Sequence, residues 1–260
     1  MGKKFDITYV FLHLPKLMSC INTTLLIVFF SILLGLVIGL LVALPRLYKI
    51  PVLQRFSEIY ISFFRGTPIL IQLFLIYYGL PEILLMVHMD ISKAPVLDFV
   101  ILTYALNSGA FLSEAIRSAV LSVDRGQVEA AYSIGMTGYQ AFTRVVMPQA
   151  IAIAIPVFAN LVIANLKDTS LAFTLGVMDL TGKAQTLAQL TQHFMETYIA
   201  LAFIYLAISL LLEKLFAMGE KRLLRYETQL ERGKRILTDK KRLTGIFSSG
   251  INLQKGGSRL

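Results

Sequence analysis

Long apolar runs separated by short polar segments dominate the chain. Five of these runs have roughly the 20 mostly apolar residues that a helix needs to cross a bilayer, where each backbone polar group must be bonded within the segment. The second run is irregular, because it contains Arg65, Gly66 and Pro68. The pattern predicts an all-α integral membrane protein whose spans cover Met18–Leu44, Phe56–Leu80, Val96–Val120, Pro148–Leu166 and Thr197–Leu215.

Composition supports this class and excludes a soluble domain. Of the 260 residues, 56% are hydrophobic and only 16% are charged, and the mean hydropathy is +0.68; a soluble surface needs more charge than this. The net charge of +9 could indicate nucleic-acid binding. However, the basic residues gather at the ends of the apolar runs and in the C-terminal tail, so we expect membrane orientation and no nucleic-acid partner.

The distribution of Lys and Arg predicts which loops face the cytoplasm. The loop after the first run, the central polar segment and the tail from Lys214 onward are rich in these residues, and the other two loops are poorer. Because short cytoplasmic loops carry the excess of positive charge, we expect an outside N-terminus and a cytoplasmic C-terminus. Lys3, Lys4 and Lys16 at the N-terminus argue for the opposite orientation, but we give the tail more weight.

The same pattern divides the chain into three parts. Residues 1–16 are expected to form an extracytoplasmic N-terminal segment, and residues 17–221 the transmembrane domain with a cytoplasmic loop at 121–148. Residues 222–260 form a basic cytoplasmic tail. Its end is rich in Gly, Ser and Lys, which predicts partial disorder.

The loop at 121–148 is polar although it lies between two apolar runs. Glu129-Ala130-Ala131 favours a helix, Gly135 interrupts it, and a second helical segment is expected from about Tyr139 until Pro148 opens the next span. The small side chains would let another surface approach the backbone closely. An amphipathic helix lying on the membrane is the alternative, but it would need a larger apolar face.

These residues resemble the EAA loop of permease subunits in ATP-driven (ABC) importers. That loop has the pattern EAA, three residues, Gly, nine residues, then Ile, any residue and Leu-Pro; here Val145 and Met147 replace the Ile and the Leu. Three further stretches look like the polar amino-acid importer branch: "FFRGTPILIQLF" from Phe63, "LNSGAFLSEAIR" from Leu106 and "NLKDTSL" from Asn165. The start "GKKFDITYVFLHLPKL" is similar to that of cystine-importer permeases. The resemblance covers about Leu17–Lys221.

The resemblance implies a type I ABC importer permease fold with about five transmembrane helices and a cytoplasmic coupling helix, in a bacterial cell membrane. It implies that Glu129, Ala130, Ala131 and Gly135 couple the permease to a cytoplasmic ATP-binding subunit. The other implied partners are an extracytoplasmic amino-acid-binding protein and a second permease subunit, identical or related. The chain itself would bind no cofactor, since ATP and Mg would be used by the partner ATPase, and it would not be an enzyme.

Polar residues inside spans are candidates for the substrate pathway, because they are costly in lipid and tend to face a cavity or another helix. We expect Asn160, and less surely Gln72 and Asn107, to contact substrate; hydrogen bonding between helices is the equally open alternative. Glu114 and Arg117, three residues apart, are expected to form a local ion pair. The fourth run contains no Asp or Glu, which disfavours a basic amino acid and favours a neutral polar one such as L-cystine or glutamine.

Two other classes of protein fit less well. A self-sufficient secondary transporter would need an ion or proton site, and no acidic residues lie in the middle of the runs. A membrane enzyme would need a catalytic constellation, and none is evident. The histidines are scattered at His13, His88 and His193 without metal-ligand spacing, so no metal site is expected.

Overall fold

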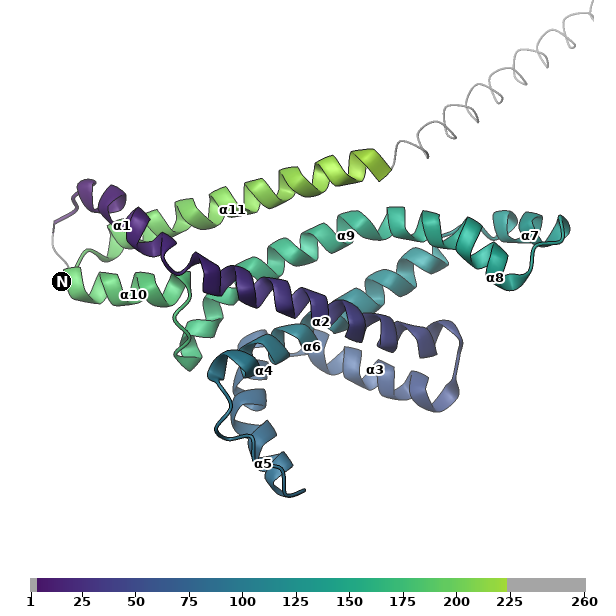
Figure 1. Cartoon of the computed structure of the whole chain (residues 1–260), viewed down its shortest axis with the longest axis horizontal. Helices are drawn as coiled ribbons and strands as arrows, with labels where there is room; N and C mark the ends of the chain where they lie inside the picture. The colour runs from purple at the N-terminus through teal and green to yellow at the C-terminus, as the bar shows by residue number, and fades with distance from the viewer. Residues whose placement is uncertain (1–3, 224–260) are drawn as a thin grey trace, which may run out of the picture. The chain divides into compact units, whose positions relative to one another are not determined.

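The computed structural model describes residues 4–223, and it contains helices and no strand within that range. Residues 1–216 form one compact unit, and the end of α11 belongs to a second one with residues 217–260. The expected basic tail therefore lies almost entirely outside the described residues. The helices, shown in Figure 1, are α1 (Thr8–Met18), α2 (Ile21–Leu47), α3 (Pro51–Gly66), α4 (Ile69–Phe74), the π-helical η1 (Leu75–Gly79), α5 (Leu80–Leu85), α6 (Val96–Leu121), α7 (Arg125–Ser133), α8 (Gly138–Ala141), the π-helical η2 (Phe142–Val146), α9 (Met147–Asp168), the 3₁₀-helical η3 (Thr169–Leu175), α10 (Leu180–Thr191) and α11 (Phe194–Leu223).

Within residues 4–223, four helical segments are long and apolar enough to cross a membrane, and a bent pair brings the number to as many as five. The four segments contain most of the first, third, fourth and fifth expected spans. They run over Ile21–Leu47, Val96–Leu121, Gly138–Leu175 and Phe194–Lys221.

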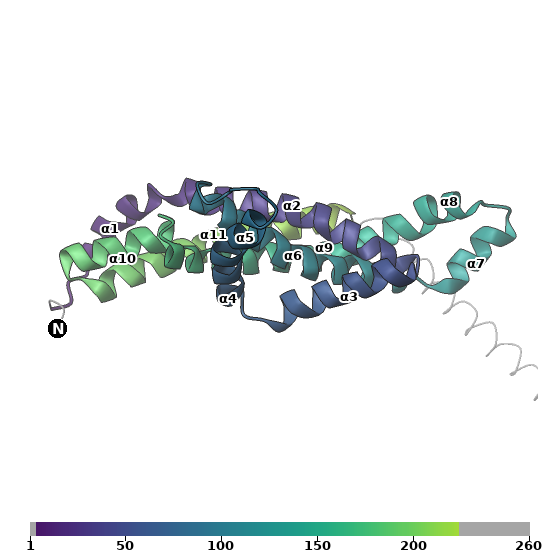
Figure 2. The ribbon, with the colours of Figure 1, turned by 90° about the horizontal axis from the view of Figure 1, so that it is seen from below.

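The second expected span, which is irregular in the sequence, is bent in the structure. α3 ends at Gly66, and the helix that resumes at Ile69 is bent by 113° from it; Figure 2 shows α4 turning steeply away from the end of α3. The cause is Pro68, because the residue before a proline avoids the helical conformation. Thr67 is accordingly extended, with φ −117° and ψ 146°.

The sequence predicts that one helical segment ends before Pro148 and that the next span begins there, but the structure has no boundary at this residue. The helix that begins at Gly138 continues through η2 into α9, and Pro148 lies in its interior. A π-turn widens the hydrogen-bond ladder, which relieves the clash and the missing N–H of a proline inside a helix. The loop at 121–148 is therefore joined to α9 without an interruption.

Close packing of α2 against α6 forms the core of the described unit. A Cβ added at Gly35 would lie 2.9 Å from the Ser108 Cβ, and one at Gly39 would lie 2.9 Å from the Leu112 Cβ. Two glycines four residues apart thus remove the side chains where the backbones meet. The two helices hold the rest of the membrane domain in register.

The N-terminal segment contains a helix that is not predicted from the sequence. Residues 8–18 form α1, which packs on α10 through buried Val10 and Leu17. The opposite face exposes apolar side chains such as Phe11. α1 is thus part of the folded domain.

Candidate functional site

The loop at residues 121–148, here called the central loop, folds as a helix, a turn and a second helix, as the sequence predicts. Asp124 caps α7, since its carboxylate accepts a hydrogen bond from the Gly126 N–H at 2.9 Å. Gly135 ends the helix with φ +83°, a conformation that glycine adopts without strain. Gly138, by contrast, needs no unusual φ and simply starts α8.

The four residues expected to couple to an ATPase take two different positions. Glu129, Ala130 and Gly135 are exposed, whereas Ala131 is 4% exposed and packs inward. The exposed surface also carries large apolar side chains, which a polar loop would normally bury. They are Tyr132, Ile134 and Tyr139, between 54% and 79% exposed.

Hydrogen bonds connect the central loop to the membrane helices. The Gln149 side-chain amide of α9 donates to the Gln127 side chain of α7 at 2.7 Å. A capping box between Thr137 and Gln140 fixes the start of α8. A small apolar core that includes Val123 and Val146 lies beneath these bonds. A displacement of α7 would therefore be passed to α9.

Gln72 and Asn107, expected in the substrate pathway, lie together in the structure. Gln72 is fully buried, and its amide nitrogen donates to the Phe64 carbonyl at 2.8 Å and to the Thr67 carbonyl at 2.9 Å. Asn107 donates to the Gln72 side-chain oxygen at 2.9 Å. These contacts hold the bend between α3 and α4 against α6, so they support the alternative of hydrogen bonding between helices.

Asn160, the third expected pathway residue, lies elsewhere. It is exposed on α9, two helical turns from Ile153 and therefore on the same face as that residue. Asn165, one turn further along, is instead buried and donates to the Ser108 hydroxyl at 2.9 Å. Of the three residues, Asn160 is the exposed one, Asn107 is part-buried and Gln72 is buried, and the role of Asn160 remains a prediction.

Glu114 forms the expected ion pair with Arg117, at 3.3 Å, and two further contacts that the sequence did not reveal. The Arg46 guanidinium of α2 lies 2.8 Å from its carboxylate, and that of Arg65 at the end of α3 lies 4.0 Å away. In the sequence, Arg46 follows the first apolar run, where it counts as an orientation signal, and Arg65 lies inside the irregular second run. This group, called the Glu114 cluster, joins α2, α3 and α6.

A second buried polar group was missed because its members are about 180 residues apart in sequence. It is called the terminal cluster and consists of Asp6, Tyr9, His13, His193, Glu196 and Thr197. The Tyr9 ring stacks on the His193 ring with centroids 3.7 Å apart. Glu196 lies 2.9 Å from His193 Nδ1 and accepts the Asp6 backbone N–H at 2.8 Å. Asp6 is exposed and Tyr9 is part-buried, whereas the other four residues are buried. Together the six residues fasten α1 to the start of α11.

His13 is buried as a neutral imidazole in this cluster. The Thr197 hydroxyl already donates to the His193 carbonyl, so it accepts from His13 Nδ1, 2.8 Å away. His13 Nε2 then has no hydrogen-bond partner within the described chain. Burial lowers the pKa of His13 below its ordinary value of 6.5, because a protonated ring would add a charge and an unpaired N–H.

Comparisons with known proteins agree with this architecture. Residues 35–225 match the family described as "Binding-protein-dependent transport system inner membrane component". The chain is 46% identical over 230 residues to the L-cystine transport system permease protein TcyL of Bacillus subtilis (strain 168), covering 88% of this chain and 96% of that one. It is also 37% identical over 218 residues to the nopaline transport system permease protein NocM of Agrobacterium fabrum, covering 83% and 90%.

Solved structures give the same result. A crystal structure of an amino acid ABC transporter with histidines matches with a TM-score of 0.76 and 34% identity, covering 85% of this chain and all of that one (100%). The inward-facing MetNI methionine ABC transporter matches with a TM-score of 0.61 and 17% identity, over 80% of this chain and 94% of that one, which shows the fold alone.

These relatives are multi-pass membrane subunits without an ATPase site of their own, so this chain is not an enzyme. The matched region contains every helix from the second half of α2 to the end of α11. The chain therefore belongs to the inner-membrane components of binding-protein-dependent transport systems, as the permease subunit of an amino-acid ABC importer.

Proposed function

We propose that the chain forms half of the pathway of an ATP-driven importer for L-cystine and couples to a separate ATPase through its central loop. The observation that carries the coupling is the exposed surface around Glu129 and Ala130, which includes Ile134 and Tyr139. A small side chain at Ala130 lets a groove of the partner approach closely, and the exposed apolar groups fill it.

Motion would pass from the ATPase to the pathway through the contacts between the central loop and α9. Gln127 on α7 is bonded to Gln149 on α9, and α8 continues into α9 through η2. Closure of two ATPase subunits would thus tilt α9, which carries Asn160. The two permease halves would then rock against each other and open the pathway alternately to the two sides of the membrane. An identical or related subunit would supply the second half.

The remaining partners follow from the same mechanism. The ATPase subunit would use ATP and Mg, and an extracytoplasmic binding protein would deliver the amino acid at the opposite end. The proposed orientation places the central loop and the C-terminus in the cytoplasm and the N-terminus outside the bacterial cell membrane, in agreement with the Arg residues of the central loop and the Lys and Arg residues of the tail.

L-Cystine is the preferred cargo for two reasons. The relative TcyL carries the name of an L-cystine permease, and α9 contains no acidic residue before Asp168 to balance a cationic side chain. Other relatives are named for nopaline or glutamine transport, so a direct comparison of cargo is needed.

The test is reconstitution of the full complex in proteoliposomes. We expect ATP hydrolysis to rise when binding protein loaded with L-cystine is added, and radiolabelled L-cystine to accumulate only with ATP. Uptake of L-glutamine and L-arginine is measured in parallel. Accumulation driven without the ATPase subunit would contradict the proposal, and preferential uptake of arginine would refute the assignment of cargo.

A further inference from the structure

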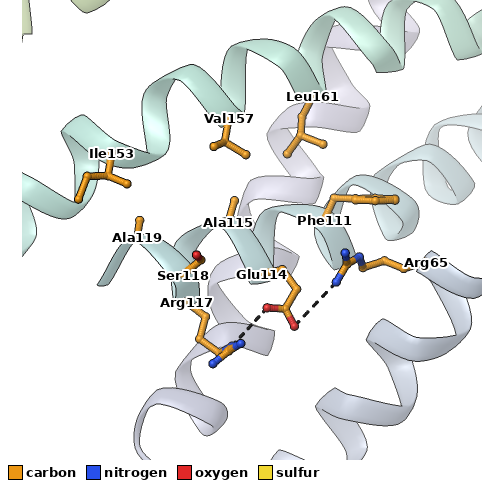
Figure 3. Close-up of a pocket in the computed structure, with 10 residues that line it drawn as sticks. All are labelled: Arg65, Phe111, Glu114, Ala115, Arg117, Ser118, Ala119, Ile153, Val157 and Leu161. Atoms are coloured by element: carbon orange, nitrogen blue, oxygen red, sulfur yellow. Dashed lines mark hydrogen bonds and ion pairs between the residues drawn. The ribbon is translucent and has the colours of Figure 1, made fainter. Parts of the chain in front are cut away.

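A pocket of about 360 Å³ opens between the end of α3, α6 and α9 (Figure 3). One side carries the charged side chains of Arg65, Glu114 and Arg117. The other side is apolar, and Figure 3 shows Ile153, Val157 and Leu161 pointing from α9 toward α6. Its volume is at the lower end of the range found for small-molecule sites and is sufficient for one amino acid.

The charged side of the pocket has an excess of positive charge. Three guanidinium groups, from Arg46, Arg65 and Arg117, surround the single carboxylate of Glu114. One negative charge balances one of the three, so two positive charges remain. Beside an apolar wall these charges are poorly screened, which makes the pocket attractive to an anion.

Two of the arginines have donors to spare. The Arg46 side chain is only 12% exposed and makes the shortest contact with Glu114, whereas Arg65 and Arg117 are 45% and 33% exposed and both line the pocket. Arg65 lies 4.0 Å from Glu114, beyond hydrogen-bond distance. Its guanidinium also lies 5.4 Å from the centroid of the Phe111 ring, which fixes its plane at the edge of the pocket.

We infer that this pocket is a cargo-binding site in which Arg65 and Arg117 bind the carboxylate of the transported amino acid. A guanidinium presents a planar fork that matches a carboxylate with two parallel hydrogen bonds. Glu114 holds the arginines in place when the pocket is empty. The apolar wall of α9 then receives the rest of the cargo. This inference rests on the proposed import function.

The uncompensated charge also gives the site a selectivity. A cargo with an unbalanced cationic side chain is repelled by the Glu114 cluster, whereas L-cystine, in which a second carboxylate balances the second ammonium group, is not. A phosphate of an anionic lipid shares the chemistry of the carboxylate. The experiment must therefore separate these two sources.

The test is equilibrium binding of radiolabelled L-cystine and of radiolabelled L-glutamine to the full complex in nanodiscs of phosphatidylcholine, without binding protein. We expect the affinity of the bound amino acid to fall about tenfold in Arg65→Gln, and less in Arg65→Lys, which keeps the charge but not the fork. Arg55→Gln is the matched control, since Arg55 is exposed on the same helix and lies outside the pocket. It should bind like the wild type.

Competition distinguishes carboxylate recognition from a structural effect of Arg65. Unlabelled L-cystine should displace the label, and cystamine, which is L-cystine without its carboxylates, should not. Displacement by cystamine, or wild-type affinity in Arg65→Gln, would overturn the inference. A lipid site would also overturn the inference. In that case the complex would bind no amino acid in phosphatidylcholine, and phosphatidylglycerol would raise its thermal midpoint in the wild type but not in Arg65→Gln.

The import assay keeps the two proposals separate. Carboxylate-dependent binding without ATP-driven uptake would contradict the proposed function and leave the site standing. ATP-driven uptake of L-cystine combined with unchanged binding in Arg65→Gln would contradict the proposed site and leave the proposed function standing.

Discussion

The terminal cluster and the central loop differ in how far their polar groups are buried and hydrogen-bonded. In the terminal cluster, His13, His193 and Glu196 are at most 4% exposed and are bonded to other groups of the same cluster. In the central loop, Glu129 and Ala130 are exposed together with large apolar side chains. The first region makes its side-chain hydrogen bonds within itself, apart from His13 Nε2, which is unpaired within the described chain, and the second leaves an exposed surface that a partner would cover.

The comparison separates stability from coupling. Changes in the terminal cluster should lower the free energy of unfolding, because buried hydrogen-bonding groups lose partners. Changes on the exposed surface of the central loop should leave the fold intact and reduce transport.

Gly135→Asp is expected to abolish coupled uptake, a loss of at least about a hundredfold, while the protein remains inserted in the membrane. The change distorts the turn at φ +83° and adds a charge to the exposed surface. Gly176→Asp is the matched control, because Gly176 has the same φ, and a Cβ at either position would meet nothing within 4 Å. Uptake and membrane level are measured for both. Equal losses of uptake in the two variants would show that backbone strain is the cause. They would contradict the claim that the exposed surface of the central loop is specifically needed for transport.

Thr197→Val is expected to destabilise the terminal cluster by about 1–3 kcal/mol, because His13 Nδ1 loses its acceptor while the shape of the side chain is kept. The thermal midpoint of the purified protein should fall by a few degrees, about 2–8 °C. Thr174→Val removes an exposed hydroxyl that bonds only to the Leu171 carbonyl, and it should leave the midpoint unchanged. An unchanged midpoint in Thr197→Val would mean that the cluster does not stabilise the fold.

Acidification should weaken the docking of α1. Because burial lowers the pKa of His13 below 6.5, the folded state binds fewer protons than the unfolded state just below that pH, and the free energy of unfolding falls as the pH drops. The groups around His13 that carry or can carry charge are Lys16, His193 and Glu196. Hydrogen exchange of residues 8–18 should therefore be faster at about pH 5.5 than at about pH 7.5, after correction for intrinsic rates.

Two variants check the assignment to His13. His13→Gln should lose most of the pH dependence, and His88→Gln, which changes an exposed histidine outside the cluster, should keep it. A pH dependence that persists in full in His13→Gln would exclude His13 as its source.

The membrane helices were predictable where one local signal decided the structure. The apolar runs located α2, α6, α9 and α11. Gly135 ended α7 as expected. The bend at Pro68 was visible as an irregularity, but its size of 113° depends on how Gln72 and Asn107 bind the neighbouring carbonyls.

The polar clusters were not predictable for a physical reason. Glu114 meets Arg46 and Arg65 only after three helices pack, and His13 meets Thr197 across 184 positions. Helical spacing reveals neighbours three or four residues apart, such as Glu114 and Arg117, and gives no information on partners from other helices. Gln72 and Asn107 likewise appeared as pathway candidates because polarity alone does not show whether a side chain is already bonded.

The most direct test of the central claim is hydrogen exchange of the permease in nanodiscs with and without the ATPase subunit. The account predicts slower exchange in residues 125–141 of the central loop when the ATPase is bound, and no change in residues 8–18 of α1. Unchanged exchange in 125–141, or protection of α1 instead, would contradict the claim that the central loop is the surface that receives the ATPase.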